Sequence, residues 1–145
     1  MTRFIPMKMK NQKMLFACVG NSARSQMAEG FAKKYMPSVE VLSAGTLPAT
    51  AVNPHAIDVM KEIGIDISMQ SPKMLVPNML KGATHFISMG CGVLDACPFP
   101  IVKGKLSVQD WELEDPAGKD LAFFRKVRDE IERRVKALRV ELELV

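Results

Sequence analysis

A cysteine and an arginine stand at the two ends of CVGNSAR, residues 18–24, called the cysteine loop below. An apolar run precedes it and a helical pattern follows, so we predict a loop that leads from a strand into a helix. Backbone N–H groups of such a loop point into one concavity and bind tetrahedral oxyanions. Arg24 adds a planar set of donors for two anion oxygens. Cys18 then lies at the base of an electropositive site, which favours the thiolate nucleophile.

The residues between the cysteine and the arginine suit the same interpretation. Gly20 lets the backbone approach an anion closely, and Asn21 tolerates the left-handed conformation that tight loops need. Ser22 and Ser25 are able to donate hydrogen bonds to the thiol. The loop lacks the Gly-Lys-Ser/Thr ending of a nucleotide-binding loop, so a triphosphate with magnesium is not expected. The predicted oxyanion-binding residues are Val19, Gly20, Asn21, Ser22, Ala23, Arg24 and Ser25.

Strand and helix signals alternate along the chain and must position this loop. Four short runs predict strands, because each is apolar or alternates apolar and polar residues: 13–19, 39–45, 85–89 and 105–111. Helical spacing, prolines and a capping Asn53 predict three helices and one short helix: 25–36, 54–63, about 119–142, and 77–81. Strands separated by helices favour a parallel sheet that is covered on both faces.

We therefore predict an α/β protein with three layers, α/β/α, around a four-stranded parallel sheet. Residues 13–145 would form one catalytic domain, and residues 1–12 a short, mobile leader. Ligands of such sheets bind at the carboxyl ends of the strands. Three loops with unusual chemistry leave three predicted strand ends: CVGNSAR, GCGVLDAC and WELEDPAG.

Composition narrows the function classes. The net charge of +4 suits an anionic substrate, but basic residues are spread out with few aromatics between them, so no nucleic-acid partner is predicted. No apolar run reaches the ~18–20 residues of a membrane span, and the N-terminus lacks a signal-peptide core, which predicts a cytoplasmic protein without membrane contact. Three cysteines and two histidines at these spacings predict neither a disulfide framework nor a metal site. Three buried, inert thiols are the alternative for the cysteines.

At this point the residues match a family. CVGNSARSQMAEGFAK resembles the signature of low-molecular-weight protein tyrosine phosphatases and, more closely, that of the thioredoxin-coupled arsenate reductases on the same fold. The resemblance continues through LSAGT, VNPHAIDVMKEIGIDIS and WELEDPAGKDLAFFRKVRDEIERRV, and it covers nearly everything from about Lys13 to Val135. It implies the low-molecular-weight phosphatase-like, or flavodoxin-like, form of the predicted fold.

A reaction at a tetrahedral oxyanion needs a proton for the leaving oxygen, and Asp115 in LEDPAG is the candidate donor. The resemblance implies the same role, since the Asp of this Asp-Pro pair is the family's general acid. An ordinary Asp-Pro turn before a helix is the alternative. Glu112 and Glu114 are flanking carboxylates. Trp111, beside them, either walls the pocket or packs in the core.

The resemblance also implies roles for Cys91 and Cys97. After Cys18 attacks arsenate, Cys91 would attack Cys18 and release arsenite, and Cys97 would then form a Cys91–Cys97 disulfide that thioredoxin reduces. Phosphate and sulfate would compete with arsenate, no cofactor would be tightly bound, and the protein would be a monomer. Five residues separate the pair here, where well-known members have six.

Two other functions compete with this reading. A phosphatase that hydrolyses phosphoesters through a Cys18 phosphoenzyme needs no further cysteine, because water completes its cycle. A non-catalytic oxyanion-binding or redox-sensing module is the third possibility. Weak phosphatase activity beside reduction would be unsurprising, since the first step is shared.

Some of the resembling reductases bind potassium near the loop through an Asn, a Glu, a Ser and a downstream Asp. Asn21, Glu29 and Ser43 match the first three positions, whereas Lys73 stands at the fourth. Because the lysine ammonium is able to take the place of the cation, no metal is predicted.

Overall fold

The structure is a computed structural model, and it describes residues 12–90 and 106–142. Four strands are present in these residues: β1 (Lys13–Cys18), β2 (Glu40–Gly45), β3 (His85–Ser88) and β4 (Ser107–Asp110). Three α-helices and a 3₁₀ helix accompany them: α2 (Arg24–Tyr35), α3 (Pro54–Lys61), α5 (Leu121–Glu141) and η1 (Pro77–Leu80). Each predicted element is confirmed to within a few residues at its ends. The leader predicted for residues 1–12 lies outside the described residues except for Gln12, so the domain boundary stays a prediction.

The four strands form one parallel sheet with the order β2-β1-β3-β4, which confirms the predicted sheet. The chain runs from β1 to β2 on one side and then returns to β3 on the other side of β1. The strand order therefore reverses at the carboxyl end of β1, where Cys18 pairs with Gly45 of β2. This switch point is where ligands bind in open α/β sheets, and the cysteine loop begins there.

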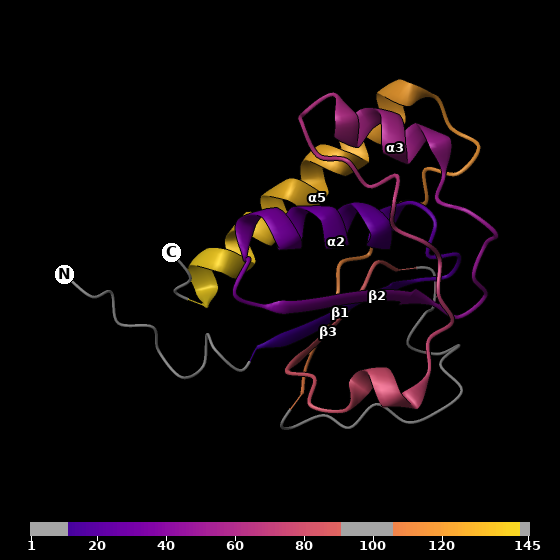
Figure 1. The fold of residues 1–145 in the computed structure, drawn as a ribbon. Coiled ribbons are helices and arrows are strands. Elements are labelled where there is room, and N and C mark those ends of the chain that lie inside the picture. Colours follow the sequence, from indigo (N-terminus) through magenta and orange to yellow (C-terminus); the bar gives the residue numbers. More distant parts are fainter. Residues whose placement is uncertain (1–11, 91–105, 143–145) are drawn as a thin grey trace.

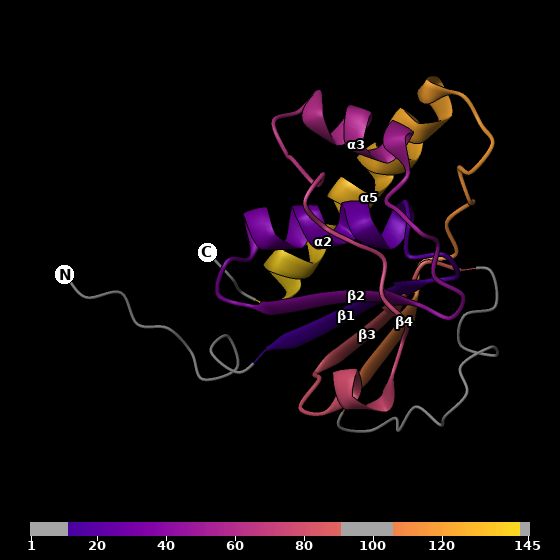
Figure 2. The same ribbon diagram turned by 45° about the vertical axis from the view of Figure 1, so that its right-hand side comes forward.

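Helices cover one face of the sheet, and η1 lies on the other face (Figures 1 and 2). Side chains of β1 alternate between the two layers. Phe16 and Cys18 belong to the core under α2, α3 and α5, whereas Leu15 and Ala17 belong to a smaller core shared with Leu75 and Phe86. A central strand that is buried on both faces must be apolar almost throughout, as the sequence around β1 is. The predicted three-layer arrangement is confirmed.

Capping residues define where two helices begin. Asn53 accepts a hydrogen bond from the backbone N–H of His55 at 2.9 Å, and Pro54 occupies the first turn of α3. Asp120 caps α5 in the same way through the N–H of Phe123, at 2.9 Å. These caps fix the first turns of α3 and α5, the helices that pack on the same face of the sheet as the Cys18 side chain.

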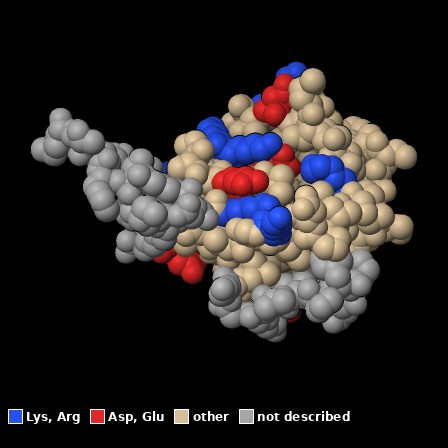
Figure 3. All heavy atoms as spheres, turned by 60° about the horizontal axis from the view of Figure 1, so that its bottom comes forward, with Lys and Arg blue, Asp and Glu red and all other residues tan. Residues whose placement is uncertain are grey.

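Charged side chains of both signs alternate on the surface of α5, which carries the ion pairs Arg133–Glu130, Arg134–Glu130 and Lys136–Glu132. Another face of the molecule likewise has basic and acidic groups side by side (Figure 3). Within residues 12–90 and 106–142, no helix combines the length and the apolarity needed to cross a membrane. The charges on α5 are thus paired along its own surface.

One titratable side chain is buried at the start of β3. His85 is 7% exposed, and its Nδ1 lies 3.0 Å from the hydroxyl of Thr84. Burial lowers the pKa of the imidazole from its ordinary value of 6.5, although the charge of Glu141 acts in the opposite direction. The unfolded chain therefore takes up this proton more readily than the folded chain does, and the free energy of unfolding falls as the pH drops below the unfolded value.

Between about pH 7 and pH 5, we expect the free energy of unfolding of His85→Gln to fall less than that of the wild type. Glutamine takes up no proton, so the two states no longer differ in proton binding at this position. Urea unfolding at a series of pH values measures this. His55→Gln is the control, since His55 is exposed. Equal slopes of stability against pH for the wild type and His85→Gln would contradict the prediction.

Candidate active site

The backbone carbonyls of residues 19–22 in the cysteine loop are bound on its outer side. Those of residues 19, 20 and 22 accept hydrogen bonds from backbone N–H groups of the segment after β2, and that of residue 21 accepts from a side chain. The pairs are Val19 with Leu47 (2.9 Å), Gly20 with Ala49 (2.9 Å), Ser22 with Asn53 (2.8 Å), and Asn21 with Gln26 Nε2 (2.9 Å). In a trans peptide the following N–H points opposite to the carbonyl. The loop N–H groups therefore face inward, as an anion-binding nest requires.

The thiol of Cys18 lies at the base of this nest. Cys18 is 3% exposed, and its Sγ accepts the backbone N–H of Asn21 at 3.2 Å. Ser25 Oγ lies 2.9 Å from the sulfur. The first turn of α2 follows with no side-chain cap, so its positive end is directed at the same place. These hydrogen bonds and the helix end are placed to stabilise negative charge on the sulfur.

The side chain of Asn21 fixes the direction of these hydrogen bonds. Its Oδ1 accepts the backbone N–H of Lys73 at 2.9 Å, while its Nδ2 donates to Ser25 Oγ at 2.7 Å and to Ser43 Oγ at 3.0 Å. When Cys18 is a thiolate, its sulfur only accepts, and the Ser25 hydroxyl is then the donor of this pair. Asn21 has the predicted left-handed backbone, with a φ of +48°. Ser22, the other predicted donor, is tied to Asn53 through its carbonyl instead.

Arg24 joins the loop to the ends of β3 and β4. It is the first residue of α2 and only 2% exposed, and its Nη1 donates to the carbonyls of Met89 (3.3 Å) and Leu113 (2.9 Å). Its Nη2 lies 3.7 Å from Oδ2 of Asp115, whose side chain is about half exposed. The other Asp115 oxygen accepts the N–H of Ala117, as in an Asp-Pro turn. The fold thus brings Arg24 and Asp115 together at the edge of the sheet where Cys18 lies.

Cys91 and Cys97 lie outside the described residues. The described chain after β3 reaches Gly90, which has a φ of +109° and packs against the backbone of Glu112 and Leu113. The Met89 carbonyl, just before it, contacts Arg24. The residues before Cys91 therefore form part of the wall of the site.

The model of the low molecular weight phosphotyrosine protein phosphatase family matches residues 13–144. The chain belongs to this family. It is 41% identical over 137 residues to an arsenate reductase of Bacillus subtilis, and the match covers 88% of this chain and 95% of that protein. It is 36% identical over 131 residues to Arsenate reductase 2 of Staphylococcus haemolyticus, with 90% and 98% covered. These matches confirm the predicted resemblance.

Solved structures of both activities share the fold. A thioredoxin-dependent arsenate reductase of Corynebacterium glutamicum has a TM-score of 0.77 and 33% identity, over 91% of this chain and 62% of that protein. An arginine phosphatase of Geobacillus stearothermophilus has a TM-score of 0.81 and 33% identity, over 91% and 93%. The likeness confirms the phosphatase-like fold for this family member.

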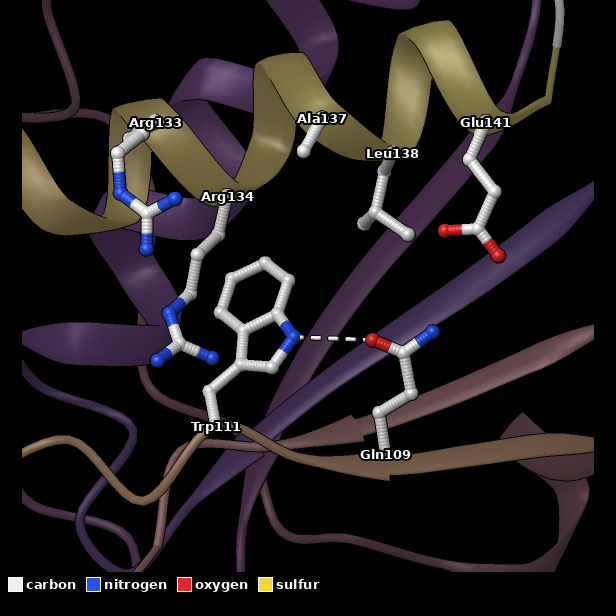
Figure 4. A pocket seen from close by; sticks show the side chains of 7 residues that line it. All are labelled: Gln109, Trp111, Arg133, Arg134, Ala137, Leu138 and Glu141. Carbon is white, nitrogen blue, oxygen red and sulfur yellow. Dashed lines mark hydrogen bonds between the residues drawn. The ribbon is translucent and has the colours of Figure 1, made fainter.

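Trp111, whose role the sequence left open, packs in the core of this family member. Its ring centroid lies 5.8 Å from that of Phe16, and its Nε1 donates to Gln109 at 3.0 Å. The guanidinium of Arg134 stands over the ring at 5.8 Å. Between Trp111 and α5 lies a hollow of about 280 Å³, lined also by Leu138 and Glu141 (Figure 4). In residues 12–90 and 106–142, no cluster of three or more His, Cys, Asp or Glu side chains is placed to hold a metal.

Sequence reasoning missed the part that Gly45 plays in the site. It was interpreted only as the end of a strand. In the structure, a Cβ on Gly45 would lie 2.5 Å from the Val19 carbonyl oxygen and 2.9 Å from the Asn21 nitrogen. Real Cβ atoms do not approach backbone atoms this closely, so only glycine lets β2 lie against the cysteine loop. Gly45 is the last residue of β2 and pairs with Cys18, but nothing in the sequence distinguishes it from a glycine that simply ends a strand.

We expect Gly45→Ala to displace the cysteine loop and to destabilise the protein by about 1–3 kcal/mol, the usual cost of an overpacked site. Phosphate should then protect the variant against urea unfolding less than it protects the wild type.

Gly64→Ala is the matched control for this experiment, because Gly64 has a φ of +82° and nothing within 4 Å of an added Cβ. It should lose stability through backbone strain alone and keep the full protection by phosphate. Equal protection of Gly45→Ala and Gly64→Ala by phosphate would show that the close contact is irrelevant to the loop.

Proposed function

We propose that this family member is an arsenate reductase that uses Cys18, Cys91 and Cys97 in turn and is regenerated by thioredoxin. The proposal rests above all on the position of the cysteine loop. Its nest faces the end of β3, and in the sequence Cys91 follows Gly90 directly. The arsenate reductases of 36–41% identity described above support the same substrate.

In the proposed first step, the Cys18 thiolate attacks arsenic. One arsenic–oxygen bond breaks, and Asp115 gives its proton to the departing oxygen, which leaves as water. Arg24 and the loop N–H groups hold the remaining oxygens, where negative charge concentrates in the transition state. The 3.7 Å separation of Arg24 and Asp115 supports this division of roles, because it puts the acid beside the anion clamp.

In the second step, the Cys91 thiolate attacks Cys18. A sulfur–sulfur bond forms, and the sulfur–arsenic bond breaks with its electron pair left on arsenic, so that arsenic(V) becomes arsenic(III). Cys97 then attacks Cys91 and frees the Cys18 thiolate. The dithiol of thioredoxin reduces the Cys91–Cys97 disulfide and so supplies both electrons. A chain that works with free thiols is expected in a reducing compartment, here the cytoplasm, and we propose that it acts as a monomer.

Phosphoester hydrolysis is the second candidate function. The match to the phosphatase family and the TM-score of 0.81 to an arginine phosphatase favour it. The first step would be the same, with Cys18 attacking phosphorus. Water would then hydrolyse the phosphocysteine and release phosphate, without any oxidation or reduction. The two functions differ in whether Cys91 and Cys97 are needed.

Coupled turnover separates the two functions. With arsenate, thioredoxin, thioredoxin reductase and NADPH, the wild type should oxidise NADPH in an arsenate-dependent way, and Cys91→Ser and Cys97→Ser should not sustain it. Cys97→Ser should leave any hydrolysis of p-nitrophenyl phosphate unharmed, and Cys18→Ser should abolish both reactions. If both downstream variants keep full arsenate-dependent NADPH oxidation, the reductase proposal is wrong.

The role of Asp115 as the acid has its own test. Asp115→Asn should lower the rate of the first step by about 10²–10⁴-fold, because it cannot give a proton to the departing oxygen. Mixing the enzyme with excess arsenate in the absence of thioredoxin limits each molecule to one turnover, and the rate of that turnover is compared between variants. Glu114→Gln is the control, since it removes a neighbouring carboxylate of the same exposed loop. Similar rates for the two variants would exclude Asp115 as the acid.

A further inference from the structure

A buried carboxylate lies behind the cysteine loop. Glu29 comes from α2, and only 6% of its side chain is exposed. A carboxylate in such a place needs hydrogen bonds and a nearby positive charge. Ser43 Oγ donates to its Oε1 at 2.5 Å, Lys33 Nζ lies 2.5 Å from its Oε2, and Lys73 Nζ lies 3.9 Å from its Oε1. The steps proposed above use none of these four groups.

A chain of hydrogen bonds connects this carboxylate to the thiol. Since Glu29 only accepts, the Ser43 proton is directed to it, and Ser43 accepts from Asn21 Nδ2. The second Asn21 amide proton goes to Ser25, whose hydroxyl donates to Cys18 when the sulfur is a thiolate. The charge on Glu29 therefore orients every donor in the chain, with the last donor pointing at the sulfur.

Lys73 contacts this chain at two points. Its backbone N–H holds Asn21 Oδ1, and its side-chain ammonium faces Glu29. Its backbone is fixed, because its carbonyl accepts the N–H of Gly45 at 2.8 Å. The ammonium is also held by the Ser71 carbonyl at 3.0 Å. Lys33 contacts only the other oxygen of Glu29 and none of the groups that lead to Cys18. It lies one helical turn along α2 from Glu29, and over half of its side chain is exposed.

We propose that the Lys73 ammonium is the countercharge at Oε1 of Glu29, the oxygen where the hydrogen-bond chain begins, while Lys33 balances Oε2, and that Lys73 is thereby a positioning residue for Cys18. Without it, Lys33 alone would balance Glu29, and the greater net negative charge behind the loop would oppose formation of the thiolate. With it, the donors stay oriented while the net charge behind the loop is balanced.

The same residues do not fit the potassium ion that some resembling reductases hold here. An alkali cation is bound by oxygen lone pairs. Asn21 Oδ1 is already engaged by the Lys73 N–H, and Glu29 Oε1 already receives the Ser43 proton and faces the ammonium. A second cation beside the ammonium would also be repelled. We therefore infer that the lysine replaces the ion in this chain.

The test measures alkylation of Cys18 by iodoacetamide across pH, followed by mass spectrometry of the peptide that carries Cys18. Lys73→Met keeps the backbone N–H but removes the charge. Its alkylation midpoint should lie about half a pH unit above that of the wild type, a roughly threefold loss of thiolate below the midpoint. Arg24 and Asp115, the other charged groups described in contact with the loop, are unchanged by the substitution.

Lys73→Arg should restore the wild-type midpoint, because it keeps the charge, and Lys61→Met is the control for loss of a lysine elsewhere, at the end of α3. The wild-type midpoint should be the same in potassium chloride and in sodium chloride of equal concentration. A Lys73→Met midpoint equal to that of Lys61→Met overturns the proposal, and so does a wild-type midpoint that potassium alone lowers. If Lys73→Met does not fold, the comparison of the two salts still decides.

The inference rests on the proposed function only where it concerns turnover. If the lysine proposal and the reductase function both hold, Lys73→Met should reduce kcat/KM for arsenate about threefold near neutral pH, in step with the thiolate. Failure of the reductase function would leave the wild type without arsenate-dependent turnover but would keep the shift in alkylation. Failure of the lysine proposal would leave turnover intact and remove the shift.

Discussion

The site depends on one constraint of the backbone. For the N–H groups of the cysteine loop to face an anion, the carbonyls of five successive residues, 19–23, must find donors on the outside. The structure supplies them all, from three backbone N–H groups after β2, the Gln26 side chain, and the Met27 N–H in the first turn of α2. An unpaired carbonyl at any of these positions would favour rotation of its peptide, and the nest would lose a donor.

Topology explains how these partners come within reach. Because β2 and β3 lie on opposite sides of β1, the segment after β2 can line one wall of the loop while the ends of β3 and β4 approach the other. The first wall requires Gly45, against which any side chain would collide. The second wall is bound by Arg24 through the carbonyls of Met89 and Leu113. The arginine is therefore held by the fold before any anion arrives, which limits the reorganisation that binding costs.

The sequence predicted what is encoded locally. Residue spacing, prolines and a capping residue were enough for every strand and helix in residues 12–90 and 106–142, and the strand-loop-helix context of Cys18 and Arg24 was enough for the nest. The position of Asp115 near Arg24 followed from its place after a parallel strand. The contacts of Lys73 with Asn21 and of Gly45 with Val19 were beyond such reasoning, because they join residues more than twenty positions apart and depend on how closely two backbones pack. Neither the periodicity of a sequence nor its capping residues indicate how closely two backbones approach each other.

The hydrogen-bond chain from Glu29 to Cys18 prepares a nucleophile but does not choose its substrate. Arsenate and phosphate are both tetrahedral anions with the same arrangement of acceptors, so the nest, Arg24 and the acid would treat them alike. The outcome must then be set after the covalent adduct has formed, when either water or a second thiol attacks. The Asp115 side chain is half exposed, so a water molecule can reach it. In the proposed mechanism this carboxylate would be the group that activates such a water. If the proposed reductase function holds, the second thiol must reach the adduct faster than water does, and the sequence after β3, where Cys91 stands, would then separate reduction from hydrolysis.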